Sequence, residues 1–136
     1  MSMIKNIIIL LLVACILRAE EITNFTIISV RDGDTFVIDI PDIPDVFGKN
    51  IAVRIRGIDT PEKNDEREEI RAIAYQAKQE LTDLLLNGEQ VVLYNLGRDK
   101  YFRLLASVRV GELDVADYLI EKKLAKPYNG GKKNVW

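Results

Sequence analysis

One long amphipathic segment constrains the fold of this chain more than any other feature. Across residues 65–86, apolar side chains recur at three- and four-residue spacing, which predicts a helix with a single apolar stripe. Asn64 or Asp65 can cap its start, and Asn87-Gly88 can end it. Three strand-like segments precede this helix, and two more strands and a second helix follow it. That order does not have the βαβ alternation of a parallel α/β sheet.

Five short segments are rich in β-branched and aromatic residues and are mostly bounded by turn-forming residues, as strands are. The predicted strands are residues 22–30, 36–40, 51–58, 90–96 and 102–110, and a second helix is predicted over 114–124. Residues 41–50 are expected to form a proline-containing surface loop, and 126–136 a basic tail laid over the body. The pattern predicts an α+β, mainly β fold: a five-stranded OB-type barrel with a helix after the third strand and a C-terminal helix. Other α+β arrangements also fit the pattern alone.

Residues 1–19 have the order of an export signal. Lys5 precedes the apolar run 7–17, and Ala19 follows it as a small exit residue. The run has about 11 residues, too few to span a bilayer, which needs roughly 20. Cleavage after Ala19 would leave one domain, residues 20–136, in a secreted or periplasmic protein. A buried N-terminal helix or strand is the structural alternative.

The end of the apolar run allows a second kind of processing. Leu12-Val13-Ala14-Cys15 resembles a bacterial lipobox, in which Cys15 would be lipidated and become the mature N-terminus. The protein would then be anchored to the cell envelope, its one contact with a membrane. On the other interpretation, Cys15 is a small apolar residue within the signal.

The composition of the domain excludes several kinds of site. Removing residues 1–19 takes away Lys5 and Arg18 and leaves 17 basic against 21 acidic residues, a net charge of −4. This balance argues against broad adhesion to nucleic acid or membranes, although a local arginine cluster can still bind phosphate. The chain has no histidine, so imidazole bases and histidine–metal sites are excluded. Its single cysteine permits no internal disulfide.

Carboxylates follow two of the predicted strands. Asp34 and Asp59 are candidate ligands for Ca²⁺ or Mg²⁺, because hard cations prefer oxygen donors. Each alone could instead be an ordinary turn or loop residue. Glu62 follows Asp59 by three residues and is the candidate general base, since no histidine can take that role. Its structural alternative is a surface glutamate.

Arginines and aromatic residues near these carboxylates suit a phosphodiester. Arg54 and Arg103 are candidate phosphate ligands, because a guanidinium offers paired donors that match phosphate oxygens. Tyr101 and Tyr128 are candidate stacking partners for bases, and Lys100 adds a steering charge beside them. Ordinary surface arginines and packed aromatic rings are the alternatives.

Three segments in order resemble one known family. Val30–Thr35, Val53–Glu62 and Asp99–Arg103, followed by Leu124-Ala125-Lys126 and Tyr128, are similar to the staphylococcal (micrococcal) nuclease family, whose fold is the OB barrel. The resemblance covers roughly residues 24–136.

The resemblance implies a role for each candidate residue. Asp34 and Asp59 match calcium ligands, and Thr60 matches the residue whose backbone carbonyl binds the metal. Arg54 and Arg103 match the phosphate-binding arginines, and Glu62 matches the general base. Tyr128 lies at or near a nucleotide-contacting tyrosine.

The activity implied is that of a calcium-dependent endonuclease, expected to be a monomer without a protein partner, which hydrolyses DNA and RNA and leaves 3′-phosphate ends. Two features depart from the family. Phe102 stands where a glycine is expected, and residues 39–49 form a longer excursion. A non-catalytic OB-type module that binds nucleic acid or protein is the alternative function, and an envelope structural protein is a third.

Overall fold

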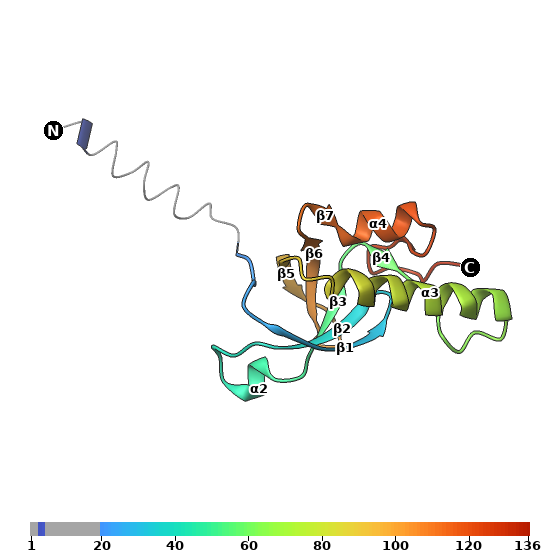
Figure 1. Ribbon diagram of the computed structural model, residues 1–136, viewed down its shortest axis with the longest axis horizontal. Helices are drawn as coiled ribbons and strands as arrows, with labels where there is room; N and C mark the ends of the chain where they lie inside the picture. The colour runs from blue at the N-terminus through green and yellow to red at the C-terminus, as the bar shows by residue number, and fades with distance from the viewer. Residues whose placement is uncertain (1–2, 5–19) are drawn as a thin grey trace.

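The computed structural model describes residues 3–4 and 20–136 (Figure 1). Nearly all of the predicted export signal, including Cys15, therefore lies outside the described residues. Within the described part of the chain, no helix combines the length and the apolar character needed to cross a bilayer.

The main sheet has six strands. Five follow one another in the spatial order β1 (Thr26–Asp32), β2 (Thr35–Asp39), β3 (Ile51–Ile55), β6 (Leu104–Val110) and β5 (Val91–Arg98), and β7 (Leu113–Asp114) pairs with β6. All neighbours are antiparallel except β3 and β6, which are parallel. A separate two-stranded sheet pairs β4 (Ile58–Asp59) with β8 (Lys126–Pro127).

The two ends of this strand order are joined at one point. Ile22, just before β1, forms a bridge with Leu93 of β5 through backbone hydrogen bonds of 2.9 and 3.0 Å. The sheet therefore curves back on itself around its apolar face, as a small barrel does. The expected mainly β fold, with a helix between the third and fourth predicted strands, is confirmed.

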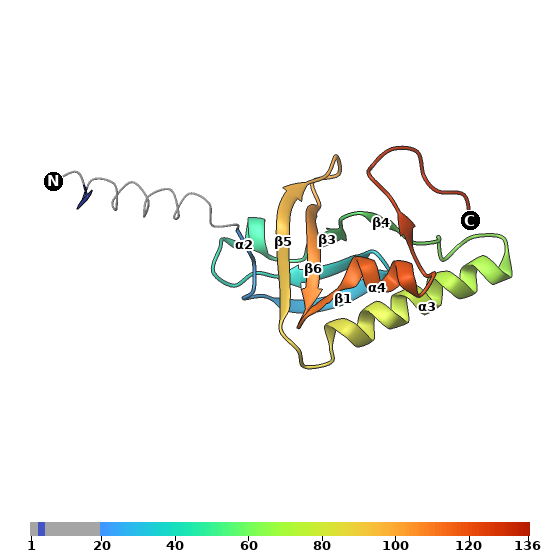
Figure 2. The same ribbon diagram turned by 90° about the horizontal axis from the view of Figure 1, so that it is seen from above.

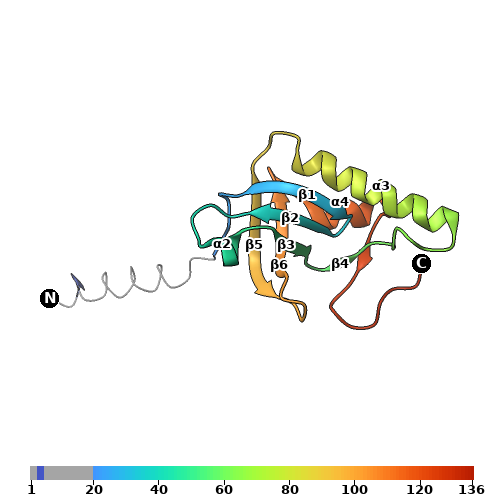
Figure 3. The same ribbon diagram turned by 90° about the horizontal axis from the view of Figure 1, so that it is seen from below.

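Three helices accompany the sheet: α2 (Asp45–Gly48), α3 (Glu68–Leu85) and α4 (Val115–Glu121). Figures 2 and 3 show α3 running along the β1 side of the sheet, with α4 beside it. The predicted apolar stripe of α3 is its buried face, formed by Ile70, Ala74, Ala77, Leu81 and Leu85. Because each buried leucine or isoleucine side chain contributes about 1.5–3 kcal/mol, Ile70, Leu81 and Leu85 contribute most to holding the helix on the sheet.

The structure corrects the expected extent of several elements. The predicted strand 51–58 is two strands, because a turn at Arg56-Gly57 interrupts it and Gly57 has a φ of 81°. The expected loop 41–50 contains the one-turn helix α2. The helix expected from residue 65 begins at Glu68.

The start of α3 differs from the predicted cap. Arg67 occupies the N-cap position, and its side chain makes no capping hydrogen bond. The Asp65 carboxylate instead accepts hydrogen bonds from the Arg67 backbone N–H at 2.9 Å and from its guanidinium. These bonds lower the pKa of Asp65 to about 2. Asp65 thus orders the loop before the helix rather than the helix itself.

The basic tail lies over the body, as expected, and is also hydrogen-bonded to it. Asp59 of β4 pairs with Lys126 of β8, and the Tyr128 backbone N–H donates to the Gly57 carbonyl at 2.9 Å. Lys126 lies over the Trp136 ring, with its Nζ 4.7 Å from the ring centroid. The tail therefore supports the short strand that carries Asp59.

Candidate active site

The turn between β1 and β2 places Asp34 in a buried position. Its Oδ1 accepts a hydrogen bond from the Thr35 hydroxyl at 2.9 Å. Its Oδ2 accepts from both the backbone N–H and the hydroxyl of Thr60, each at 3.1 Å. These bonds tie the turn to the segment after β4, so two parts of the chain 26 residues apart form one acidic wall.

Gly33 allows α3 to approach this turn closely. A Cβ at Gly33 would lie 2.6 Å from the Ala77 Cβ of α3 and 2.9 Å from Thr60 Cγ2, both too short for real contacts. Gly33 does not have a positive φ. Close packing, rather than a left-handed turn conformation, therefore explains the glycine at this position.

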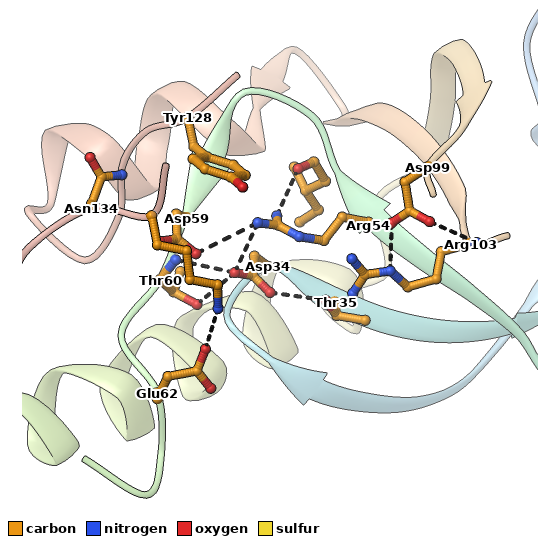
Figure 4. Close-up of polar contacts among 12 residues, drawn as sticks. Asp34, Thr35, Arg54, Asp59, Thr60, Glu62, Asp99, Arg103, Tyr128 and Asn134 are labelled. Carbon is orange, nitrogen blue, oxygen red and sulfur yellow. Dashed lines mark hydrogen bonds and ion pairs between the residues drawn. The ribbon is translucent and has the colours of Figure 1, made fainter. Parts of the chain in front are cut away.

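Arg54 lies between two buried carboxylates. Figure 4 shows its guanidinium directed toward Asp34 and Asp59, with Nη2 3.5 Å from Asp34 Oδ2 and 3.6 Å from Asp59 Oδ1. Its Nη1 donates to the Ile55 carbonyl at 3.0 Å. The exposed fractions of Arg54, Asp34 and Asp59 are 9%, 7% and 4%. Strand β3 thus supplies one cation to an acidic pair formed by the β1–β2 turn and strand β4.

The acidic pair has more negative charge than Arg54 alone can neutralise. Burial, and then the nearby Asp34 carboxylate, raise the pKa of Asp59 above its ordinary value, although Lys133 and Arg54 oppose the shift. A raised pKa means that this environment disfavours the ionised carboxylate. Additional positive charge near the pair would therefore be favourable.

The donor set of the acidic pair fits a hard cation. Asp34 and Asp59 offer carboxylate oxygens, and Thr60 is held beside Asp34 through its backbone N–H and hydroxyl. In the described residues, no group of three or more acidic, histidine or cysteine side chains is arranged to hold a metal. Two carboxylates fill only part of a calcium shell, so water or phosphate oxygens would have to complete it.

A cavity of about 530 Å³ opens beside Arg54. Its lining includes Arg54, Lys100, Tyr101, Arg103 and Tyr128, five of the residues expected to act on the substrate. The parallel pairing of Arg54 with Leu105 on β6 brings this strand beside the loop that carries Arg103. The Arg54 Cζ lies 5.8 Å from the Tyr128 ring centroid, and the Arg103 Cζ 5.4 Å from that of Tyr101.

Asp99 fixes the position of Arg103. Its Oδ2 accepts from Arg103 Nε at 2.6 Å, and its Oδ1 accepts from the backbone N–H groups of Tyr101 and Arg103 at 2.9 and 3.0 Å. Burial raises the pKa of Asp99, but the hydrogen bonds from Arg103 and Tyr101 outweigh it and hold the pKa below its ordinary value. The sequence reasoning missed this role, although the four-residue spacing of Asp99 and Arg103 was a signal for it.

Glu62 lies at the edge of the site, in the loop between β4 and α3, and does not line the cavity (Figure 4). Its exposed carboxylate accepts from Lys133 Nζ of the C-terminal tail at 2.7 Å. That hydrogen bond is the main reason why the pKa of Lys133 is raised. Lys133 was not anticipated, because 71 residues separate it from Glu62.

The predicted residues therefore fall into three groups. Asp34, Arg54, Asp59 and Thr60 form one contacting cluster. Arg103, Lys100, Tyr101 and Tyr128 share the cavity with Arg54. Glu62 stands apart, paired with Lys133. The structure thus joins the acidic pair to the cavity through Arg54.

Comparison with known protein families gives a match over most of the described domain. The family model described as "Staphylococcal nuclease homologue" matches residues 52–135. This range contains Arg54, Asp59, Glu62 and Arg103, whereas Asp34 precedes it. A search of curated proteins found no match to the chain.

Proposed function

The chain belongs to the staphylococcal nuclease homologue family, and we propose that it is a calcium-dependent endonuclease that hydrolyses DNA and RNA and leaves 3′-phosphate ends. One observation carries the proposal most directly. Arg54 contacts both buried carboxylates and also lines the cavity that Arg103 lines. A candidate metal site and two candidate phosphate ligands are thereby adjacent, which is the arrangement that phosphodiester hydrolysis needs.

Members of this family generally depend on calcium. Asp34, Asp59 and the Thr60 carbonyl would hold the ion in this chain. When bound, Ca²⁺ would supply positive charge beside the scissile phosphate and so reduce its repulsion of an incoming nucleophile. Because the two carboxylates are buried, water would screen this charge only weakly.

Arg54 and Arg103 would donate hydrogen bonds to the phosphate oxygens. Arg54 is held by the Ile55 carbonyl, and Arg103 by the Asp99 carboxylate. Donors that are positioned in advance stabilise the charge that develops on phosphorus in the transition state more than they stabilise the substrate. Loss of either arginine should slow turnover by about 10²–10³-fold, or about 2.7–4 kcal/mol.

Glu62 would accept a proton from the attacking water or orient that water. A carboxylate is the available base, because the chain has no histidine. Lys133 would have to release Glu62 when substrate binds, since a carboxylate bound to an ammonium group is a poorer base. The water oxygen would bond to phosphorus as the bond to the 5′-oxygen breaks. The leaving 5′-oxygen would take up a proton from solvent, and the phosphate would remain on the 3′ end of the other product.

Substrate binding would extend along the cavity. Tyr101 and Tyr128 would stack on bases, and Lys100 would contribute a nearby positive charge. We propose that the protein acts as a monomer outside the cytoplasm, either secreted or periplasmic after cleavage of residues 1–19, or lipid-anchored to the envelope through Cys15. Mass spectrometry of the mature N-terminus distinguishes these forms.

Cleavage of plasmid DNA, with and without a calcium chelator, tests the activity. The expected result is cleavage in calcium and none in chelator. Binding of DNA without cleavage under both conditions would instead support the non-catalytic OB-type module. Phosphatase-sensitive 3′ ends on the fragments, detected by mass spectrometry, would identify the side of bond scission.

Variants assign the site residues on a quenched-fluorescent DNA in excess calcium. Arg103→Ala should slow turnover by about 10²–10³-fold. Arg109 is a half-exposed arginine of β6, and Arg109→Ala should keep wild-type turnover. Glu62→Gln should slow turnover and leave DNA affinity intact. Wild-type turnover by Arg103→Ala would defeat the assignment of Arg103.

A further inference from the structure

Phe102 has a backbone conformation that phenylalanine rarely adopts. Its φ is 60°, in the left-handed region, where the Cβ of an ordinary residue approaches the following carbonyl oxygen. Glycine is the usual residue at such a position. Local backbone conformation therefore does not explain why this position holds a phenylalanine.

Packing does not supply that reason. The Phe102 side chain is 82% exposed, and it lies outside the core of the described chain. The next residue towards the N-terminus, Tyr101, is also exposed, at 66%. The loop therefore presents two consecutive aromatic side chains to solvent, beside a cavity that Tyr101 and Arg103 both line.

The surrounding loop holds Phe102 in this conformation. Its backbone N–H donates to the Asp99 carbonyl at 3.1 Å, and its carbonyl accepts from Arg98 Nη1 at 2.9 Å. The Asp99 carboxylate also binds the N–H groups of both neighbours of Phe102. Backbone strain that several bonds fix in this way is a feature of ligand sites.

The charges around Phe102 complement nucleic acid. Lys100 and Arg103 flank the two adjacent aromatic residues, and Arg98 ends strand β5 just before them. The acidic Asp99 is paired with Arg103. Cations beside aromatic rings suit a single strand, because the cations meet phosphates while the rings stack on bases. Phe102 does not line the cavity, so its ring can meet only a part of the strand beyond the nucleotide held there.

We propose that Phe102 forms a stacking subsite for an unpaired base that flanks the nucleotide in the cavity, and so makes the protein favour single-stranded over double-stranded substrates. This inference rests on the proposed function, because it takes the cavity as the place where the phosphodiester binds. Duplex DNA offers no free base face, since its bases already stack on one another. The subsite therefore discriminates by strandedness rather than by sequence.

The test measures affinity for a fluorescein-labelled oligothymidylate octamer and for a hairpin duplex, by anisotropy, in a chelator that stops metal-dependent cleavage. Phe102→Leu keeps an apolar side chain of similar size but removes the ring. Its ratio of single-strand to duplex affinity should fall roughly tenfold, within the 5- to 150-fold range expected for one lost stacked base. Phe102→Tyr should keep the wild-type ratio. Phe47→Leu, which alters an exposed phenylalanine of α2, is the matched control and should also keep it.

Each other outcome overturns the inference. A wild-type ratio in Phe102→Leu, an equal loss for octamer and duplex, or a wild-type protein that does not bind the octamer would each do so. The binding assay does not require cleavage, so the two proposals fail separately. A protein that binds as expected but never cleaves DNA would refute the endonuclease alone, and one that cleaves DNA but is insensitive to Phe102→Leu would refute the subsite alone.

Discussion

Replacing Arg54 by leucine tests the energetic coupling at the centre of the site. The substitution keeps an apolar stem on β3 and removes the one guanidinium that lies within 3.6 Å of both Asp34 and Asp59. Because all three residues are at most 9% exposed, water can solvate the unpaired carboxylates only poorly. Removing one partner from a buried ion pair costs about 3–5 kcal/mol.

This cost converts to a measurable change in melting temperature. A domain of this size loses about 4 °C for each kcal/mol, so Arg54→Leu should melt roughly 12–20 °C below wild type in chelator. Calcium should reduce the difference in melting temperature between the variant and wild type, because a cation held by Asp34 and Asp59 would replace part of the missing positive charge. Circular dichroism melts of both proteins, in chelator and in saturating calcium, give the difference in melting temperature under each condition.

Arg109→Leu is the matched control. Arg109 pairs with Glu21 at 3.8 Å on the surface, where such a bridge contributes at most about 1 kcal/mol. An Arg54→Leu protein that melts no lower than this control in chelator would refute the coupling. A difference from wild type that calcium leaves unchanged would refute the placement of the ion between the two carboxylates.

Three further predictions follow from contacts of the site. Calcium at a hundredfold excess over its Kd should stabilise the wild-type protein by about 2.7 kcal/mol. Asp34→Asn should abolish most of this stabilisation, which thermal melts across a calcium titration would measure. Gly33→Ala should lower the free energy of unfolding by about 1–3 kcal/mol, because the new methyl group overpacks against Ala77. In urea unfolding, the double variant with Ala77→Gly should recover part of that lost free energy. No recovery would contradict the packing explanation. Asp99→Asn should destabilise the Arg103 loop at neutral pH, and because the pKa of Asp99 is lowered in the folded state, the difference from wild type should shrink as the pH falls below about 4 and through that lowered pKa. A difference in melting temperature that does not shrink as the pH is lowered across the acid range would show that Asp99 acts through its shape rather than its charge.

The sequence predicted the secondary structure best where one local pattern dominated. The stripe from Ile70 to Leu85 predicted α3, because helical periodicity extends over five turns. The membership in the staphylococcal nuclease homologue family agrees with the predicted OB-type fold. The strand expected over 51–58 was broken at Gly57, since apolar alternation on both sides of that glycine concealed the turn. Pairing with β2 sets the extent of β1, Thr26–Asp32, which differs from the strand expected over 22–30.

The candidate site was predictable as a set of residues but not as a geometry. Asp34 and Asp59 each follow a strand pattern and Arg54 lies within one, and the fold brings the three into contact. Glu62 was placed with them by its spacing from Asp59, yet the structure pairs it with Lys133. The pairing depends on the path of the tail, which no local pattern specifies.

The pairing of β4 with β8 has a consequence for how the protein matures. The strand that bears Asp59 has only two residues, and its one partner, Lys126–Pro127, follows every other strand and helix in chain order. During synthesis, the nascent polypeptide must therefore extend beyond residue 127 before β4 can pair with β8. Under the proposed function, a chain that ends before that point would lack the strand partner that supports one of its two candidate metal ligands.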